Sequence, residues 1–536
     1  MLAGPVHASA QERPDTGAVT VLLATHPWLG NGGQFVDVQR AIRAVRNADG
    51  TPSIRWSTDA GRPTDAATRL LTHVARDEES SRAQQADAAR IDSLARAFAA
   101  TPASATDRAL LDVALDVITA RHAYLHGQGR VDPTRVHGEW SLAPADVNLA
   151  AVLSRLAGGA APADVFRELE PQTRSYALLV SSLDAVRRHD ADSTSHRPAP
   201  PAGTIGAGQR YASASALARV LVQLGELPAA FPIQTVGRRY TKPMYDAVAR
   251  WQNRKVRKGR VTGALTAPVL AALMQEYDAR GDRIAMAIER WRWLPRTFSN
   301  DPLVVNLPEY RLHSFTRFQG DPATDSISMN VVIGRADSNA TPVFSANMTQ
   351  VVFSPQWHVP TSIMVKEILP AAAADAGYLA RHDYELTTTG GRIIPSTPQN
   401  IARIGTGVMV RQRSGDGNAL GKVKFLLPNP YAIYLHDTPS RSFFRRVRRD
   451  FSHGCVRLGD PMALARYVLG NQPAWNDSKI TEAMNAGVER YVRVPRPIPV
   501  LIVYQTAVAD ADGQVRYFND VYGHDSTLGA AMRAAR

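Results

Sequence analysis

Cysteine is almost absent from this sequence, since Cys455 is the only one in 536 residues. A single thiol cannot form an internal disulfide, so packing alone must hold the fold together. Long apolar runs are also missing, and no segment reaches the roughly 18 apolar residues expected of a membrane span. Acidic residues are outnumbered, with 49 Asp and Glu against 62 Lys and Arg and a net charge of +13. This balance indicates an acidic partner, which DNA, anionic lipid and an acidic wall polymer all satisfy.

Nucleic acid is the least suitable of these partners. The basic residues are dispersed along the chain, and no known nucleic-acid reader motif accompanies them. We therefore expect no nucleic-acid partner.

The first 31 residues are predicted to be a leader. Ala8-Ser9-Ala10 has the small-x-small pattern that signal peptidases cut after, although the basic start of a secretion signal is missing. We expect the end of a secretion signal here. A disordered, alanine-rich leader is the alternative interpretation.

The remaining sequence predicts a multidomain α+β protein, because a chain of this length usually holds several domains. Helical periodicity indicates an all-α domain over 32–208, with no catalytic constellation and a packing role. A small three-helix module is predicted over 209–276 and a connecting helix over 277–300. Alternating, β-branched segments then predict a β-rich domain over 301–525, interrupted by a helical insertion that begins at 362. Every candidate for chemistry lies in this last domain.

The environment of Cys455 suggests nucleophilic catalysis. An unassisted thiol, with a pKa of about 8.5, is mostly protonated at neutral pH, and a nearby histidine can take its proton. His436, predicted to end the strand 431–436, is a suitable base after the chain returns. His453 is less suitable, because two residues of separation in an extended segment leave little freedom to align. Gly454 permits a tight turn, and backbone N–H groups beside it are predicted to hold an oxyanion.

Three other interpretations are open at this point. In the first, His436, His453 and Cys455 are zinc ligands, although no fourth ligand has standard spacing. An inert buried cysteine among core histidines is the second. A papain-like or NlpC-like hydrolase is the third, but those enzymes place the cysteine before the histidine, and only His524 lies downstream here.

One longer motif resembles a known family. His436, a gap of 15 residues, and then Ser452-His453-Gly454-Cys455-Val456-Arg457 resemble the signature of L,D-transpeptidases with a YkuD-like catalytic domain. The stretches 332–370, 419–440 and 497–523 resemble the large YcbB-type subfamily of Gram-negative bacteria. Arg457 replaces the Asn of many shorter members, but the YcbB type also uses Arg.

The resemblance implies a role for each motif residue. Cys455 is the expected nucleophile, His436 the general base, and the amides of Gly454 and Cys455 the oxyanion donors. The hydroxyl of Tyr434 is expected near the same oxyanion, with a core aromatic as the alternative. Arg457 is expected to meet a substrate carboxylate or to brace the loop. The remaining motif residues, Ser452 and His453, are assigned to the substrate side of the site. His453 is expected to brace the loop or to contact the wall.

The family reaction and its setting follow as expectations. The thiolate attacks the bond between the L-centre of meso-diaminopimelate and the terminal D-Ala of a tetrapeptide stem. D-Ala leaves, a thioester forms, and the amine of a second diaminopimelate resolves it into a 3→3 crosslink. Partners are then peptidoglycan stem peptides, glycan and carbapenem β-lactams, without cofactor or metal, in the periplasm of a Gram-negative bacterium. Hydrolysis, lipoprotein attachment and a mainly wall-binding role are the alternatives.

The subfamily also implies accessory parts. The module over 209–276 resembles a peptidoglycan-binding unit, with a purely structural unit as the alternative. The insertion, extended to about 362–420, resembles the capping subdomain that gates the site. The basic run 441–450 is expected to contact acidic stem peptides. Trp291 and Trp293 are expected to pack between domains.

Overall fold

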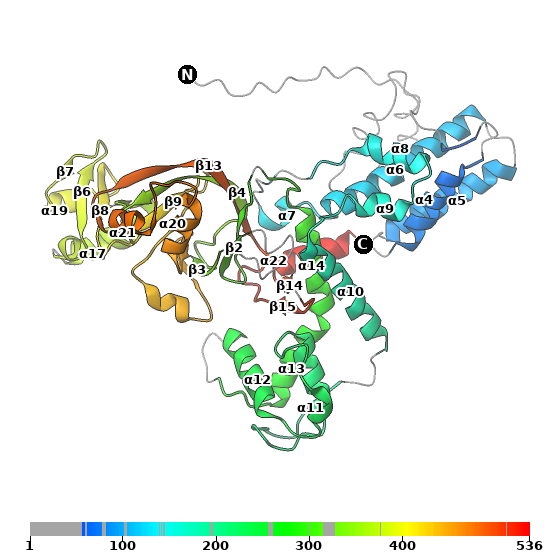
Figure 1. Ribbon diagram of the computed structural model, residues 1–536, viewed down its shortest axis with the longest axis horizontal. Coiled ribbons are helices and arrows are strands. Elements are labelled where there is room, and N and C mark those ends of the chain that lie inside the picture. The colour runs from blue at the N-terminus through cyan, green and yellow to red at the C-terminus, as the bar shows by residue number, and fades with distance from the viewer. Residues whose placement is uncertain are drawn as a thin grey trace.

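A computed structural model describes residues 56–535 apart from 59–61, 78–81, 101–103, 139, 141, 143–144, 193–196, 256–260, 299, 315–326, 376 and 511. The predicted leader therefore lies outside the described residues. Figure 1 shows a helical lobe at the upper right, a small helical module projecting below, and a β-rich lobe on the left that ends in a separate insertion. No helix in the described ranges is both long and apolar enough to cross a membrane.

The helical lobe packs around one long buried helix, α6. Its N-cap Ser104 forms a capping box with Asp107, which satisfies the first free backbone amides. Leu111, Ala114 and Leu115 of α6 are fully buried among the neighbouring helices. The lobe's helices are α4 (Asp65–Arg76), α5 (Arg82–Ala100), α6 (Ala105–Gln128), α7 (Thr134–His137), α8 (Leu149–Ala157), α9 (Pro162–Arg167) and α10 (Arg174–Asp192).

The projecting module has its own apolar core, built by α11 (Ala214–Gln223), α12 (Lys242–Lys255) and α13 (Ala267–Asp278), with a 3₁₀ turn at Ile233–Thr235. Thr266 caps α13 by accepting a hydrogen bond from the amide of Val269. This agrees with the start signal in the sequence, a threonine followed by a proline in the first turn.

One helix connects the three lobes. Helix α14 (Arg280–Arg292) follows the module directly and is buried along most of its length. Trp291 packs in the core shared by α10, β1 and β13, and Trp293 packs in a second cluster with helix α22. Both tryptophans therefore join domains, as the sequence predicts.

The β-rich lobe is a nine-stranded sheet in the order β11-β3-β12-β10-β9-β4-β13-β1-β2, and an additional β2–β3 pairing curls it toward closure. Apolar side chains from its strands and from two helices fill one core. The strands are β1 (Leu303–Asn306), β2 (Arg311–Ser314), β3 (Ser328–Gly334), β4 (Phe344–Phe353), β9 (Val423–Leu426), β10 (Leu435–His436), β11 (Asp450–Ser452), β12 (Val456–Leu458) and β13 (Arg490–Val503). The packing helices are α20 (Pro461–Leu469) and α21 (Asp477–Asn485).

Strand β10 is shorter than the predicted strand 431–436. Ala432 adopts a positive φ of 54°, which interrupts an extended backbone. The Asn429 side chain also accepts the amides of Tyr431 and Ile433, at 3.0 and 3.2 Å, in place of a neighbouring strand. The alternating pattern was therefore right only at its end.

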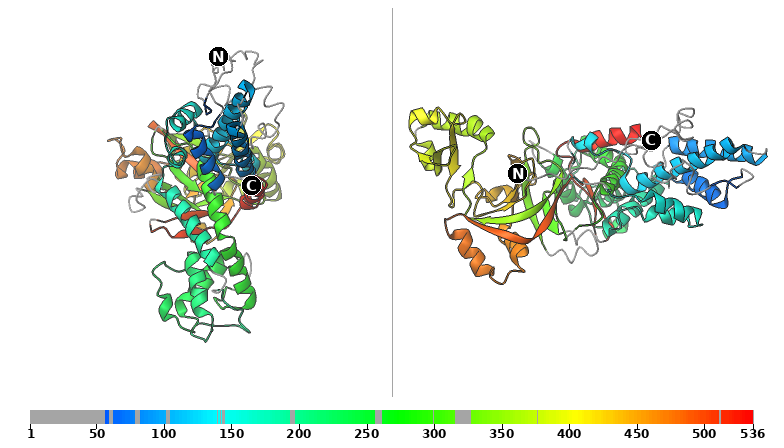
Figure 2. Two further views of the ribbon diagram at one scale, coloured as in Figure 1. Left: turned by 90° about the vertical axis from the view of Figure 1, so that its right-hand side faces the viewer. Right: turned by 90° about the horizontal axis from the view of Figure 1, so that it is seen from above.

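The insertion begins with the helical run that the sequence predicts from 362, but it also contains a sheet that the sequence does not predict. The helical run lies between β5 and the other three strands of a four-stranded sheet in the order β5-β8-β6-β7. Figure 2 shows it projecting from one end of the main sheet. Its elements are β5 (Trp357–His358), α16 (Thr361–Ile363), a π-helical turn (Met364–Ile368), α17 (Leu369–Ala374), α18 (Tyr378–Arg381), β6 (Tyr384–Thr388), β7 (Ile393–Ile394), α19 (Pro398–Ile401) and β8 (Val408–Gln412).

The chain's last elements return to the joint between lobes. A hairpin of β14 (Ala507–Ala509) and β15 (Val515–Tyr517) precedes α22 (His524–Ala534), which packs on α7 and α14. Asp525 at the start of α22 pairs with Arg290 at 2.7 Å. The C-terminal segment thereby ties the β-rich lobe to the connecting helix.

Candidate active site

Parallel pairing of β10 and β12 brings the four principal motif residues to one face of the sheet. Leu435 lies opposite Val456, and His436 opposite Arg457. Leu435 and Val456 point into the core and are fully buried. Because side chains alternate along a strand, Tyr434, His436, Cys455 and Arg457 share the opposite face. Cys455 and His436 are diagonal neighbours on adjacent strands, a separation that aromatic side chains can bridge.

A tight turn presents the thiol. Gly454 has φ +117°, a backbone conformation that residues with a Cβ rarely adopt, and a Cβ there would meet Ile433 Cδ1 at 3.1 Å. Ser452 holds the turn, because its hydroxyl donates to the Cys455 carbonyl at 2.6 Å and accepts from the Gly454 amide at 3.1 Å. The turn itself therefore accounts for a serine at 452 and a glycine at 454.

The Gly454 amide was expected to hold an oxyanion, and its hydrogen bond in the structure differs from that expectation. It donates to Ser452 Oγ, so it is engaged in the turn rather than free to hold an oxyanion. Of the two amides expected at the oxyanion, only that of Cys455 remains a candidate in this conformation. The catalytic contribution of Gly454 is thus its backbone conformation.

Two residues outside the motif buttress the turn from behind. Thr341, fully buried, donates from its hydroxyl to the Gly454 carbonyl at 2.7 Å and accepts the Gly334 amide at 2.9 Å. Tyr522, from the C-terminal segment, donates to the Gly334 carbonyl at 2.8 Å and accepts the Thr341 amide at 3.2 Å. The motif gave no signal for either residue, because both are brought in by tertiary structure.

The tautomer of His436 follows from its partner. Nδ1 lies 2.5 Å from the Asp437 carbonyl, which can only accept, so Nδ1 carries the proton. Nε2 of the neutral ring then has a free lone pair, as a general base requires. The Asp437 carboxylate fixes this segment, since it accepts the Lys422 amide at 2.9 Å and pairs with Arg441 at 2.5 Å.

Burial sets the resting charges of the pair. Desolvation, together with the nearby Arg457 charge, lowers the pKa of His436 to about 3. Desolvation raises the pKa of Cys455 to about 11, against the hydrogen bonds from Tyr434. The free protein therefore holds a neutral imidazole and a neutral thiol at pH 7, rather than an ion pair.

Tyr434 is directly beside the thiol. Burial, the neighbouring sulfur and its hydrogen bond raise the pKa of this phenol well above its ordinary value. Its ring lies 5.6 Å from that of His436 in a T-shaped arrangement. The hydroxyl is a neutral donor at the sulfur, which favours the predicted oxyanion contact over a purely structural aromatic.

Arg457 is a partly buried cation without a carboxylate partner among the described residues. Its guanidinium lies 5.9 Å from the centre of the Phe443 ring, and its Nε makes no hydrogen bond. Burial lowers its pKa, against the attraction of Cys455. Since a buried charge without a partner is costly, an anionic ligand would stabilise this site. That favours a substrate carboxylate over loop bracing.

His453 contacts the insertion. Its Nε2 lies 2.7 Å from Glu367 Oε1 in the π-helical turn, which makes a direct link between the thiol loop and the insertion. His453 thus has a partner that the sequence did not indicate, and its role in bracing the loop or contacting the wall stays a prediction.

The basic run 441–450 includes a 3₁₀ turn (Arg441–Arg445), and Arg448 pairs with Asp450 at 2.6 Å.

The zinc alternative at Cys455 has no geometric support. In the described part of the chain, the ligand atoms of His436, His453 and Cys455 do not form one of the compact groups that suit a metal ion. His436 and His453 also each use a ring nitrogen on another partner.

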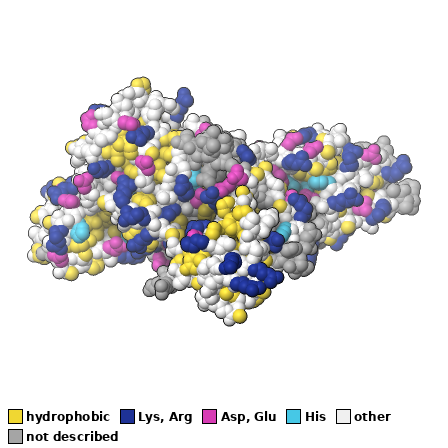
Figure 3. All heavy atoms as spheres, turned by 60° about the horizontal axis from the view of Figure 1, so that its bottom comes forward, with side chains coloured by type: hydrophobic (Ala, Val, Ile, Leu, Met, Phe, Trp, Pro, Cys, Tyr) yellow, Lys and Arg dark blue, Asp and Glu magenta, His cyan; other side chains and the backbone are white. Residues whose placement is uncertain are grey.

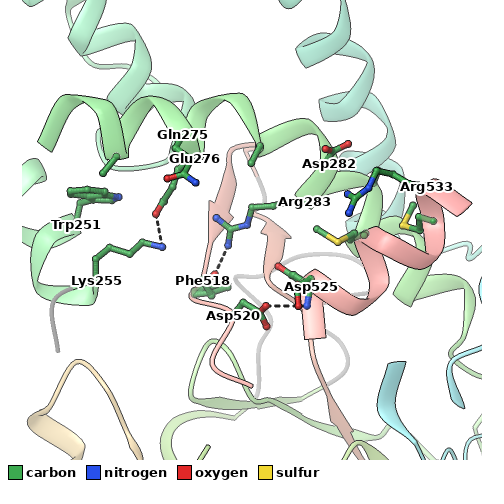
Figure 4. A pocket seen from close by; sticks show the side chains of 17 residues that line it. Trp251, Lys255, Gln275, Glu276, Asp282, Arg283, Phe518, Asp520, Asp525 and Arg533 are labelled. Atoms are coloured by element: carbon green, nitrogen blue, oxygen red, sulfur yellow. Dashed lines mark hydrogen bonds and ion pairs between the residues drawn. The ribbon is translucent and has the colours of Figure 1, made fainter. Parts of the chain in front are cut away.

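A cavity of about 800 Å³ lies away from these residues, between the projecting module and α14, α22 and the C-terminal segment (Figure 4). Its charged groups already have partners. Lys255 pairs with Glu276 at 2.5 Å, Arg283 donates to the Phe518 carbonyl, and Asp520 accepts the Asp525 amide at 3.1 Å. Its size therefore does not make it the reacting site.

Comparisons with known proteins define the class. Residues 301–489, which include every motif residue, match the L,D-transpeptidase catalytic domain of the YkuD family, and residues 52–183 match a scaffold domain. The chain is thus similar to YkuD-type L,D-transpeptidase catalytic domains over 301–489 and to a scaffold domain over 52–183. Its fold class is the multidomain α+β arrangement that the sequence predicts.

One relative is more specific. A Haemophilus influenzae protein named "Putative L,D-transpeptidase" is 31% identical over 251 residues, which cover 46% of this chain. The match spans 49% of that protein, about half of its length.

Proposed function

We propose that this protein is a cysteine-dependent L,D-transpeptidase that forms 3→3 crosslinks between meso-diaminopimelate residues of peptidoglycan. The observation that carries the proposal is the shared face of Tyr434, His436, Cys455 and Arg457, built by the pairing of β10 with β12. It supplies a nucleophile, a base, an oxyanion donor and an anion-binding cation within one site.

In the first half-reaction, His436 Nε2 takes the Cys455 proton as the sulfur attacks the carbonyl at the L-centre of a donor diaminopimelate. Tyr434 and the Cys455 amide stabilise the developing oxyanion, a contribution that is usually large in acyl transfer. The C–N bond to D-Ala breaks, the imidazolium returns its proton to the leaving amine, and a thioester remains on Cys455. Arg457 binds a stem carboxylate and holds the donor in place.

In the second half-reaction, the side-chain amine of another diaminopimelate attacks the thioester. His436 accepts a proton from this amine, and the C–S bond breaks to regenerate the thiol. Water in place of the amine gives a carboxypeptidase, and a lipoprotein amine gives an attachment enzyme. The insertion contacts the thiol loop through Glu367. In this proposal it controls which acceptor enters the site.

The proposal includes the setting of the enzyme. We place it in the periplasm of a Gram-negative bacterium, with stem peptides and glycan as partners, carbapenems as acylating inhibitors, and the module over 209–276 assisting wall binding. The net charge of +13 supports attraction to this acidic polymer.

The test uses purified disaccharide-tetrapeptide muropeptides and mass spectrometry of the products. The proposal predicts a dimer that has lost one D-Ala, with fragmentation that locates a diaminopimelate–diaminopimelate bond. Cys455→Ala should abolish the dimer and retain the fold by circular dichroism. Tripeptides alone would favour the carboxypeptidase. An unchanged dimer yield from Cys455→Ala would contradict cysteine dependence, and wall binding without any product would favour a structural protein.

A further inference from the structure

The scaffold lobe contains a histidine cluster that the proposed chemistry does not use. His73 and Asp77 lie one turn apart on α4 and its C-cap, and His122 and His126 lie one turn apart on α6. Residues four apart share one face of a helix. The two pairs face each other across the α4–α6 contact, in a different lobe from Cys455.

Three imidazoles converge on a single carboxylate oxygen. Asp77 Oδ2 lies 2.9 Å from His122 Nε2, 3.1 Å from His126 Nε2 and 3.9 Å from His73 Nε2. In a tetrahedral zinc site with bonds of about 2.0–2.1 Å, two ligand atoms are about 3.3 Å apart. The ligand atoms of His73, Asp77 and His122 all lie within 4.8 Å of one another.

Hydrogen bonds within the protein do not satisfy this cluster. His122 is fully buried, and neither of its ring nitrogens makes a hydrogen bond, although Nε2 is close to Asp77. His73 Nε2 is buried without a partner as well. Each unsatisfied buried polar group costs about 1–3 kcal/mol, so a ligand that engages these nitrogens would stabilise the fold.

We propose that the scaffold lobe binds one Zn²⁺ through His73, Asp77 and His122. Two imidazole nitrogens and one carboxylate oxygen suit this ion, and a water molecule from the adjoining cavity completes a four-coordinate set. Since α4 with its C-cap and α6 both supply ligands, the ion staples α4 to α6.

The surroundings of the cluster match a built metal site. His126 donates from Nδ1 to Glu170 Oε1 at 2.7 Å and from Nε2 to Asp77 Oδ2 at 3.1 Å, which holds the Asp77 carboxylate in place. Carboxylates that bind a metal are usually held by such an outer hydrogen bond. Phe166 stacks on His73 and His126 and meets His122 edge-on at 4.4 Å, so it supplies an apolar wall.

The ion has a route to the site. A cavity of about 560 Å³ reaches His73, Asp77, His126 and Glu170 from the surface. Figure 3 shows histidine side chains open to solvent on the helical lobe at the right. Arg187 and Arg188 also line the cavity and oppose a cation, while Asp184 and Glu170 favour one.

Zinc here would act on the joint between lobes. Glu170 Oε1 also lies 3.2 Å from Arg292 Nη2, at the end of the connecting helix α14. The chain of contacts from the ion through Asp77, His126 and Glu170 to Arg292 therefore couples occupancy of the site to the seating of α14.

The test uses the full chain without a polyhistidine tag. Wild type, Cys455→Ser, His73→Ala, Asp77→Asn and the control His189→Ala, whose ring contacts Tyr277 instead, are incubated with ZnCl₂ and desalted. Mass spectrometry of the elements gives zinc per chain, and Co²⁺ substitution gives the visible spectrum of tetrahedral cobalt. Circular dichroism shows that each variant is folded, and His73→Ala and Asp77→Asn avoid the fully buried His122.

The proposal predicts one zinc per chain and a tetrahedral cobalt spectrum in wild type, Cys455→Ser and His189→Ala. His73→Ala and Asp77→Asn should bind at least tenfold more weakly and lose the spectrum. A chelator should lower the melting temperature of wild type, Cys455→Ser and His189→Ala but not that of the two site variants. Folded wild type that retains no zinc and gives no such spectrum overturns the proposal. Equal binding by wild type and the two site variants overturns it as well.

Discussion

At the scale of single residues, burial determines how Cys455 reacts. The thiol is neutral at rest because the pKa of Cys455 is raised to about 11, and the pKa of His436 is lowered to about 3. Proton transfer must then accompany attack on a substrate rather than precede it. The site is therefore arranged to react with a positioned acyl group rather than with solution electrophiles.

The reactivity of Cys455 toward iodoacetamide tests these resting charges. Alkylation requires the thiolate, whose fraction falls tenfold for each pH unit below the pKa. At pH 7 we expect alkylation about 300-fold slower than that of a free cysteine of pKa about 8.5. The rate, followed by intact mass, should rise tenfold per unit up to about pH 10. A plateau beginning near pH 6 would contradict the neutral pair and indicate a thiolate–imidazolium pair.

Gly454 is the residue whose conformation the site depends on most. Its φ of +117° and the 3.1 Å approach of Ile433 Cδ1 mean that Gly454→Ala adds strain of about 1–3 kcal/mol. We expect the variant to fold and to lose at least tenfold in the rate of Cys455 acylation. The matched control is Gly391→Ala in the insertion, where φ is +82° and nothing lies within 4 Å of the added Cβ. Equal effects on acylation would show that the turn does not position the thiol.

At the scale of elements, the thiol loop and the insertion are linked by one exposed ion pair, His453 with Glu367. Such pairs contribute about 0–1 kcal/mol, which changes a local opening equilibrium by up to about fivefold. The link therefore holds the insertion loosely, as a gate for acceptors requires.

Hydrogen exchange of the π-helical turn Met364–Ile368 measures this link. Glu367→Gln should increase exchange there by up to about fivefold at pH 6, without a change in the β-sheet. Asp375→Asn, which removes an ion pair with Arg381 inside the insertion, is the control. If both substitutions leave exchange at 364–368 unchanged, the contact does not hold the insertion.

The elements also show where sequence patterns are sufficient. Period-two alternation identified the β-rich character of 301–525, because its strands bury one or both faces in a shared core. It overestimated β10, where the Asn429 side chain and the positive φ of Ala432 replace strand pairing. It missed the sheet of the insertion, whose strands are short and are interrupted by an alanine-rich helical run.

The residues of the candidate site also divide into those that the sequence motif predicts and those that only the tertiary structure brings together. The motif identified Ser452, Gly454 and Cys455 as neighbours, since local chemistry forms the turn. Thr341 and Tyr522 support that turn from 113 residues before Gly454 and from the C-terminal segment, and only tertiary structure brings them there. Likewise, no sequence pattern around Glu367 predicts its contact with His453.

At the scale of the whole molecule, α14 organises the lobes through buried charges. Glu289 is almost fully buried and accepts the amides of Arg130 and Val131 at 2.6 and 2.7 Å. Burial raises the pKa of Glu289, against the attraction of Arg130 and Arg292. A carboxyl whose pKa is raised on folding contributes stability below its unfolded pKa, of about 4.3, and loses it as pH rises through the folded value.

Glu289→Gln tests this joint, because the amide oxygen can still accept both backbone amides. We expect wild type and the variant to melt together near pH 4 and the variant to melt at a higher temperature at pH 8. Glu289→Ala should melt lower at both pH values, since two buried amides each lose about 1–3 kcal/mol. Glu168→Gln, at an exposed acid paired with Arg155, should not show the gain at pH 8. The same gain there would contradict an origin in burial.

The most direct test of the central claim is the mass of the intact protein after exposure to a carbapenem. The account predicts a single acyl adduct that peptide mapping locates on Cys455. In His436→Gln the adduct should form at least about 100-fold more slowly, the usual contribution of a general base, while the exposed-site control His453→Gln stays within about fivefold of wild type. An adduct on another residue, or one that forms equally fast in His436→Gln, would contradict the account.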